Sequence, residues 1–149
     1  KRIALINHDL SYKYARLRER GYKSVIHLRD LDYQAVEYAS ELSSGAGMAA
    51  MQNLLKANPP DAVFAVSDTL AAGALRAIQQ AGLRVPEDIA VVGFDGTELA
   101  EMISLTTIEQ PSRDIGRKAV NLLLNKIDNP DAPTERVMMD WRFISRASS

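Results

Sequence analysis

The segment from Arg84 to Asp95, with the sequence R-V-P-E-D-I-A-V-V-G-F-D, places the strongest constraint on the fold of this chain. Pro86 restricts the residue before it to extended conformations, so the preceding element ends there. Ile89 to Phe94 is an uninterrupted apolar run, a pattern typical of a parallel strand that is buried on both faces. The segment therefore predicts a central strand of a parallel sheet.

The carboxyl end of this predicted strand carries Asp95. Open α/β sheets bind ligands beyond the carboxyl ends of their strands, so a carboxylate in this place is a candidate binding group. Asp side chains also commonly cap turns. From this segment alone, a ligand-binding role and a turn-capping role are both open for Asp95.

Apolar runs and helical periodicity alternate along the rest of the chain. The expected strands are Arg2 to Ile6, Ala35 to Tyr38, Ala62 to Val66, Ile89 to Phe94, Leu105 to Glu109 and Arg136 to Ile144. The expected helices are Tyr12 to Leu28, Ala46 to Lys56, Asp68 to Gln80, Ser112 to Ile127 and a short helix or turn at Glu98 to Met102. The apolar face of the first helix is expected to comprise Leu17, Gly21, Val25 and Leu28. This alternation predicts an α/β fold, a Rossmann-like parallel sheet flanked by helices with right-handed crossovers.

The composition is that of one globular domain, with 149 residues, of which 46% are hydrophobic and 25% are charged. The net charge of −1 gives no electrostatic footprint for a phosphate backbone, so we expect that this chain alone does not bind DNA. The absence of cysteine excludes disulfides and thiolate catalysis and fits a cytoplasmic protein. The longest apolar runs are too short to span a bilayer.

Sequence signatures of enzymes are weak in this chain. His8 and His27 are its only histidines, and they do not have the spacing of metal ligands. No G-x-S-x-G nucleophile elbow is present. Gly45-Ala46-Gly47 precedes a helix but lacks the third glycine of a dinucleotide fingerprint and the Gly-Lys-Ser/Thr of a nucleotide loop. We therefore expect a protein that is not an enzyme, with no catalytic residue, no metal site and no cofactor.

Polar side chains follow two of the apolar strands at the edge where such sheets bind ligands. Ser67 and Asp68 follow one strand, and Asp95 ends the next. Arg18, on the helix after the first strand, is expected to reach the same edge. A guanidinium donates two hydrogen bonds in one plane and a carboxylate accepts two, so the pair complements a ligand with vicinal hydroxyls.

These residues also have structural explanations. Arg18 lies in a run of charged residues and is compatible with a solvated helix face. Asp68 precedes a well-formed helix, which favours a role as its N-cap over a direct ligand contact. For Ser67 both roles are open.

A series of segments carries a family resemblance. They are R-I-A-L-I from Arg2, A-R-L-R-E-R-G-Y from Ala15, P-D-A-V-F-A-V-S-D-T-L-A-A-G-A-L-R-A-I from Pro60, G-L-R-V-P-E-D-I-A-V-V-G-F-D from Gly82, L-T-T-I-E-Q-P from Leu105, I-G-R-K-A-V-N-L-L-L from Ile115 and I-S-R-A-S-S from Ile144. In this order they resemble the C-terminal part of the LacI/GalR family of bacterial transcriptional regulators. The resemblance covers nearly the whole chain.

The resemblance implies a lobe like those of type I periplasmic binding proteins, which binds a small-molecule effector. It implies effector contacts from the positions of Arg18 and Asp95, often from Ser67 and in some members from Gln110. The effector is expected to be a sugar or a related polar metabolite, with purine-type effectors and phosphorylated sugars as open alternatives.

Some sugar-responsive relatives carry an aromatic residue where this chain has Glu41 or Leu42. Tyr12 and Tyr14, in the loop after the first strand, are candidates to replace that aromatic residue. The full set of candidate effector-binding residues is Arg18, Ser67, Asp68, Asp95, Gln110, Tyr12 and Tyr14.

The resemblance also implies a division of the chain between two lobes. We expect residues 1–104 to form a C-terminal lobe, 105–133 to be a crossover strand and helix of an N-terminal lobe, and 134–149 to return as a strand of the first lobe. Family members also carry an N-terminal helix-turn-helix domain. The chain, which begins at Lys1, is therefore expected to be part of a cytoplasmic, homodimeric repressor that contacts operator DNA only through that domain.

Two alternatives are open. A periplasmic solute-binding protein of the ribose-binding type has the same fold with a secretory signal, although the V-P-E-D-I-A-V-V-G-F-D segment favours the regulator. An α/β enzyme of flavodoxin-like shape requires a catalytic base or cofactor loop that the sequence does not show.

The helix expected at Ser112 to Ile127 carries an apolar stripe at three- to four-residue spacing, formed by Ile115, Ala119, Leu122, Leu123 and Ile127. Exposing a large aliphatic side chain forfeits roughly 1.5–3 kcal/mol. We expect the stripe to pack back on its own sheet, to be buried by a second copy of the chain, or to be covered by another part of a larger molecule.

Overall fold

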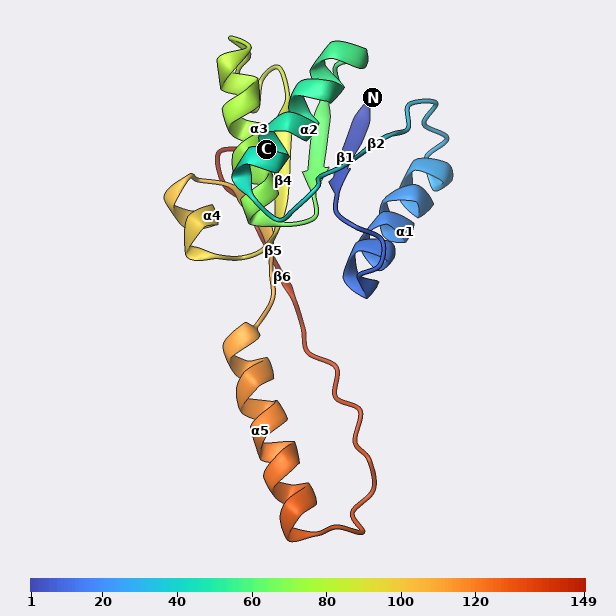
Figure 1. The fold of residues 1–149 in the computed structure, drawn as a ribbon, viewed down its shortest axis with the longest axis vertical. Helices are drawn as coiled ribbons and strands as arrows, with labels where there is room; N and C mark the ends of the chain where they lie inside the picture. The colour runs from blue at the N-terminus through green and yellow to red at the C-terminus, as the bar shows by residue number, and fades with distance from the viewer.

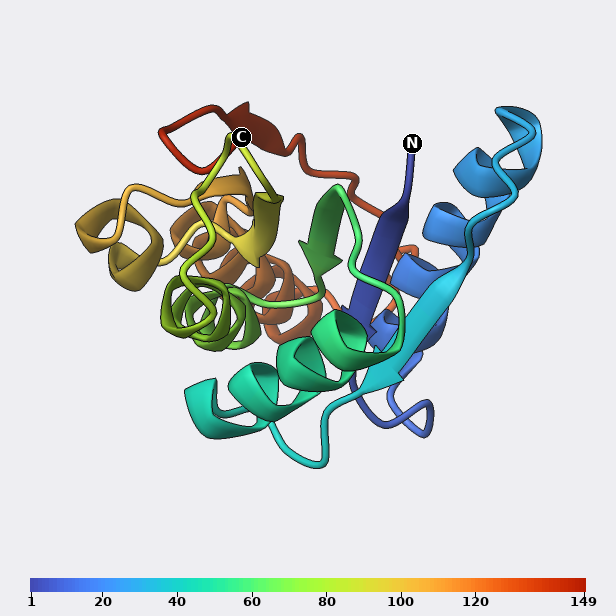
Figure 2. The same ribbon diagram turned by 90° about the horizontal axis from the view of Figure 1, so that it is seen from above.

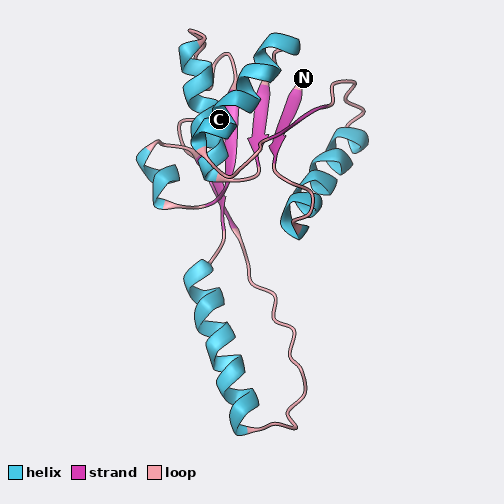
Figure 3. Cartoon of the chain, in the orientation of Figure 1, coloured by secondary structure: helices cyan, strands magenta, loops and turns pink.

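Six strands form a single sheet in the computed structural model, which describes all 149 residues. The strands are β1 (Ile3–Asn7), β2 (Ala35–Tyr38), β3 (Ala62–Ala65), β4 (Ala90–Asp95), β5 (Thr106–Glu109) and β6 (Arg142–Ile144), in the order β2-β1-β3-β4-β5-β6. Strands β1 to β5 are parallel, and β6 runs antiparallel to β5. The predicted α/β sheet is confirmed. The last strand is shorter than predicted, because residues 136–141 lie in an irregular segment (Figure 3).

The helices are α1 (Lys13–Leu28), α2 (Ser44–Ala57), α3 (Asp68–Gln80), α4 (Glu98–Met102) and α5 (Ser112–Asp128). Seen from above, α1 lies on one side of the sheet and α2 and α3 lie on the other (Figure 2). This is the arrangement that right-handed crossovers produce when β2 and β3 lie on opposite sides of β1. None of the helices combines the length and the apolar character needed to cross a bilayer.

The core lies between the sheet and the α2–α3 pair. Its almost completely buried side chains are Leu5, Val63 and Val91 of the sheet and Met51 and Leu70 of these helices.

The axes of α2 and α3 approach closely because glycines lie at their contact. A Cβ on Gly47 of α2 would lie 2.3 Å from the carbonyl oxygen of Leu70 in α3, and a Cβ on Gly73 of α3 would lie 2.0 Å from the carbonyl oxygen of Ser44 in α2.

The buried face of α1 differs from the prediction. Leu17, Val25 and Leu28 are 51%, 52% and 79% exposed, whereas the sheet is covered by the opposite face of the helix, where Tyr22 and Ile26 are buried. The periodicity was compatible with a helix but could not decide which of its two apolar stripes faces inward. Polar pairing with the sheet decides it, because the Tyr22 hydroxyl donates to the carbonyl of Ile3 at 2.7 Å.

The structure also corrects the place of the strand expected to belong to an N-terminal lobe. Strand β5 pairs with β4 in this sheet, with Asp95 opposite Glu109, and Leu105 and Thr106 are fully buried. The chain leaves the lobe only after β5, at Gln110. From there α5 and residues 129–141 stand away from the sheet (Figure 1).

The C-terminal residues fasten β4 to β5. The Ser148 hydroxyl donates to the carbonyl of Val91 at 2.6 Å and accepts from the backbone N–H of Thr106 at 2.8 Å. The Arg146 guanidinium donates to the carbonyl of Leu105 at 2.7 Å. These bonds hold together the two strands whose far ends carry Asp95 and Gln110.

Helix α5 has no buried residue, so the first of the three expected outcomes, packing back on its own sheet, is wrong. Val120, Leu123 and Ile127 are 56%, 60% and 63% exposed. We expect the 149-residue chain by itself to self-associate through this helix. Full burial of an exposed aliphatic side chain gains roughly 1.5–3 kcal/mol, and burying the exposed part of these three would recover about half of that for each.

Sedimentation velocity over a range of chain concentrations measures this association. The double substitution Leu123→Lys and Ile127→Lys is expected to give a monomer with an unchanged circular dichroism spectrum. A wild-type chain that stays monomeric at high micromolar concentration contradicts the prediction.

Candidate functional site

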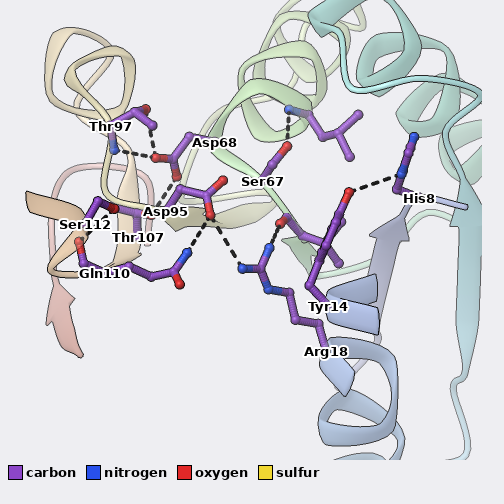
Figure 4. A network of polar contacts seen from close by, with 12 residues as sticks. His8, Tyr14, Arg18, Ser67, Asp68, Asp95, Thr97, Thr107, Gln110 and Ser112 are labelled. Atoms are coloured by element: carbon purple, nitrogen blue, oxygen red, sulfur yellow. Dashed lines mark hydrogen bonds and ion pairs between the residues drawn. The ribbon is translucent and has the colours of Figure 1, made fainter. Parts of the chain in front are cut away.

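A row of polar and aromatic side chains lies along the carboxyl edge of the sheet, from Gln110 after β5 to His8 after β1 (Figure 4). The Gln110 amide Nε2 donates to Asp95 Oδ1 at 2.9 Å, and Arg18 Nη2 lies 3.5 Å from the same oxygen. The Arg18 guanidinium lies 5.0 Å from the centre of the Tyr14 ring, and the Tyr14 hydroxyl is 3.2 Å from His8 Nδ1. The structure thus brings together residues from the loop after β1, from α1, from the end of β4 and from the crossover after β5.

Arg18 is held by the protein rather than solvated. Its side chain is only 14% exposed, its Nη1 donates to the carbonyl of Val66 at 2.5 Å, and its guanidinium stacks 3.6 Å from the centre of the Phe94 ring. Such stacking and bonding fix the plane of the guanidinium before any ligand binds. The solvated-face explanation of Arg18 is therefore wrong.

Asp95 ends β4 in a backbone conformation that favours glycine, with φ at 122°, and Gly96 follows with φ at 74°. The tight turn brings the chain against β5, where a Cβ on Gly96 would lie 2.6 Å from the Cα of Glu109. Asp95 does not cap this turn with its carboxylate, which accepts instead from the side chains of Arg18 and Gln110. The side chain is 35% exposed and is available to a ligand.

Asp68 is the residue that holds the turn after β4. Its Oδ2 accepts from the backbone N–H and the hydroxyl of Thr97 at 2.8 and 2.9 Å, and its Oδ1 accepts from the Thr107 hydroxyl at 2.6 Å. Because Asp68 is 1% exposed and both of its oxygens are engaged, it braces α3 against the β4 turn and β5. Nothing in the sequence indicates that Thr97 and Thr107 are the partners of Asp68, because only the fold brings these residues next to it.

Ser67 is the N-cap of α3, and the prediction of this role for Asp68 is wrong. The Ser67 hydroxyl accepts from the backbone N–H of Leu70 at 3.2 Å, while Asp68 is the first residue of the helix. The side chain of Ser67 is close to the row but is nearly buried. Of its two possible roles, the structure shows the structural one.

A polar depression of about 740 Å³ continues the row beyond Asp95 and Gln110. Its lining contains no hydrophobic residue. The residues that line it are Asp95, Gly96, Thr97, Glu109, Gln110, Pro111, Ser112, Arg113, Asp114 and Arg142. The depression therefore suits a hydroxylated or charged group rather than an apolar one.

A second polar cluster, which the sequence did not reveal, lies at the ends of β1 and β2. Glu19 is 6% exposed and accepts from Asn7 Nδ2 at 2.8 Å, from the Tyr38 hydroxyl at 3.1 Å and from Lys23 Nζ at 2.6 Å. Burial opposes ionisation of Glu19, but hydrogen bonds from Lys23, Asn7 and Tyr38 outweigh it and lower its pKa. The cluster fixes α1, and with it Arg18, against the sheet.

The model for the periplasmic binding protein-like domain matches residues 1–149. The ribose operon repressor of Haemophilus influenzae is 36% identical to this chain. The aligned region covers 99% of this chain and 46% of the repressor. The chain spans about half the length of the curated relatives it matches.

Solved structures agree with this similarity. An uncharacterized protein from Actinobacillus succinogenes is 49% identical, with a TM-score of 0.93 over 100% of this chain and 55% of that one. A LacI family transcriptional regulator from Enterococcus faecium with bound ribose is 30% identical, with a TM-score of 0.89 over 99% of this chain and 56% of that one.

Proposed function

We propose a function for this chain, which belongs to the periplasmic binding protein-like domain family and, within it, to the LacI/GalR regulators. The chain is proposed to be the effector-binding part of a transcriptional repressor that binds a small polar ligand. The observation that carries the proposal is the Arg18–Asp95 pair at the carboxyl edge of the sheet, whose side chains are positioned by other protein groups.

The chemistry of this pair supports a hydroxylated ligand. A ligand with two neighbouring hydroxyls accepts from the Arg18 guanidinium and donates to the Asp95 carboxylate, and Gln110 offers an amide on the far side. The ribose-bound relative and the ribose operon repressor make a sugar the first class to test. The ribose operon repressor and the LacI family transcriptional regulator favour a regulator over a periplasmic solute-binding protein or an enzyme.

The exposed face of α5 supports a second lobe. We propose that another part of the protein covers Val120, Leu123 and Ile127, so that the ligand lies between two lobes. Closure of the lobes on the ligand would change DNA affinity, because a ligand shifts an equilibrium only through its different affinities for the two conformations. A cytoplasmic homodimer, with operator contacts made by a separate domain, completes the proposal.

The test uses the intact protein. Titration calorimetry with ribose, other pentoses, hexoses and purines identifies the ligand, and operator affinity is then measured with and without it. A ligand that binds and changes operator affinity supports the proposal. A protein that binds its operator but none of the ligands, or whose operator affinity is unchanged by a bound ligand, contradicts it.

The proposed role of Asp95 predicts a pH dependence. Burial raises the pKa of Asp95 above its ordinary value of 3.8, the neighbouring Arg18 charge opposes this shift, and the Asp68 charge adds to it. Protonation removes the negative charge that pairs with Arg18 and that strengthens hydrogen bonds from the ligand hydroxyls. Ligand affinity should therefore fall as the pH drops through this raised pKa, beginning at a higher pH than for an ordinary Asp. Because the folded-state pKa is raised, protonation of Asp95 by itself favours the folded state, so its own titration does not reduce stability at low pH.

Titration calorimetry from neutral pH down to about pH 4 measures this dependence. The Asp95→Asn variant is expected to bind more weakly and to lose the pH dependence. A variant that retains the wild-type pH profile assigns the titration to another group.

A further inference from the structure

Three rings form a corner at the β1 end of the row, beside Arg18. The His8 and Tyr14 rings are parallel within 5°, with centres 6.5 Å apart. The Tyr12 ring is tilted by 38° to both, with its centre 5.2 Å from His8 and 5.7 Å from Tyr14. We call these three residues the aromatic corner.

Only one ring of the aromatic corner is open to a ligand over a large area. His8 is 7% exposed, and Tyr14 is tied to it by its hydroxyl while the Arg18 guanidinium lies against its ring. Tyr12, in contrast, is 51% exposed. Tyr14 and His8 therefore support the Tyr12 ring, which presents its surface outward.

The loop that carries Tyr12 is fastened at several points without a ligand. The backbone N–H of Tyr12 donates to the carbonyl of Asp9 at 3.2 Å, and the Asp9 carboxylate accepts from the backbone N–H of Ser11 at 2.8 Å. The Arg16 guanidinium donates to the carbonyls of Leu10 and Ser11. A ring presented by a loop that is already ordered binds at a lower entropic cost.

The two ends of the row thus have different chemistry. The Asp95 end continues into a depression without hydrophobic lining, whereas the Arg18 end meets three rings. A free pentose is matched by the hydroxyl-binding end alone. A ligand with a planar ring next to its hydroxyls makes fuller use of the aromatic corner than a free sugar does, since planar bases stack on aromatic side chains.

We propose that Tyr12, supported by Tyr14 and His8, stacks on the planar base of a ribonucleoside whose ribose hydroxyls bind Arg18 and Asp95. This inference rests on the proposed function, because it assigns the ligand class of the same site. Tyr12 is then the residue that distinguishes a nucleoside from its free sugar.

Titration calorimetry of the intact protein with adenosine, cytidine, ribose and adenine tests this assignment. At least one nucleoside is expected to bind about 10- to 100-fold more tightly than ribose, the range that one aromatic stack provides. Tyr12→Ala should remove most of this difference and leave the affinity for ribose nearly unchanged, whereas Tyr12→Phe should retain it. The matched control is Tyr33→Phe, because Tyr33 donates its hydroxyl to the carbonyl of Asn58, away from the row.

Three results overturn the inference. The first is that ribose binds as tightly as either nucleoside, the second is that neither nucleoside binds, and the third is that Tyr12→Ala leaves the nucleoside preference intact. If ribose or another sugar binds in these cases and changes operator affinity, the proposed function stands without the aromatic subsite. If no ligand of any class binds, the proposed function is contradicted as well.

Discussion

Gly73→Ala is expected to lower the unfolding free energy of this lobe by about 3 kcal/mol or more, at the upper end of what overpacking costs. The added Cβ would lie 2.0 Å from the carbonyl oxygen of Ser44 and 2.5 Å from the backbone N of Met48. Both contacts are with the backbone of α2, so no side-chain rotation relieves them. The α2–α3 pair would have to separate, and with it the core around Met51 and Leu70.

Denaturant unfolding of the 149-residue chain measures this effect. The matched control is Gly21→Ala, also in a helix, where a Cβ would meet no atom within 4 Å. This control is expected to stabilise the chain by about 0.5–1 kcal/mol, because alanine loses less backbone entropy than glycine. Equal effects of the two substitutions would show that α2 and α3 are not in close contact.

Arg18→Met is expected to reduce ligand affinity in the intact protein by about 100-fold or more. Truncating one partner of a desolvated, hydrogen-bonded charge pair typically costs about 2–5 kcal/mol. Because the Arg18 side chain is 14% exposed and that of Asp95 is 35% exposed, we expect a cost in the lower part of this range. Asp95 would keep only Gln110 as a partner, and the carbonyl of Val66 would lose its donor. The long apolar side chain of methionine still covers Phe94, so the loss reports on the guanidinium and not on packing.

Arg18→Lys separates charge from geometry. Lysine restores the positive charge but not the planar pair of donors, so it should recover only part of the affinity. Arg20→Met is the control, since Arg20 lies two residues away on the exposed side of α1. A wild-type affinity for the Arg18→Met variant would remove the Arg18–Asp95 pair from the proposed site.

Local sequence patterns determined the elements of this fold. The bounds of β2, α3 and α4 agree with the prediction, and those of most other elements differ from it by one or two residues. The apolar run at Ile89 to Phe94 predicted a central strand, and β4 lies between β3 and β5. Periodicity and turn residues act over a few residues, so they are legible without knowledge of the rest of the chain.

Part of the candidate site also followed from the sequence. Arg18 and Asp95 were expected at one edge because both follow parallel strands, and the structure brings them within 3.5 Å. The proximity of Gln110 to Asp95 depends on the pairing of β5 with β4. The sequence did not predict this pairing, because the resemblance assigned the β5 segment to another lobe. The neighbours of Asp68, which are Thr97 and Thr107, lie 29 and 39 residues further along the chain.

By itself, the sequence determined the family, the alternation of strands and helices, and the strand ends that carry Arg18 and Asp95. Only the tertiary structure decided which face of α1 is buried, that Ser67 caps α3, and that Asp68 braces the turn after β4. The physical reason is the range of the interactions. Periodicity and turn preference depend on neighbours in the chain, whereas the partner of a buried polar group depends on which distant segments meet. The same local pattern is compatible with many tertiary arrangements.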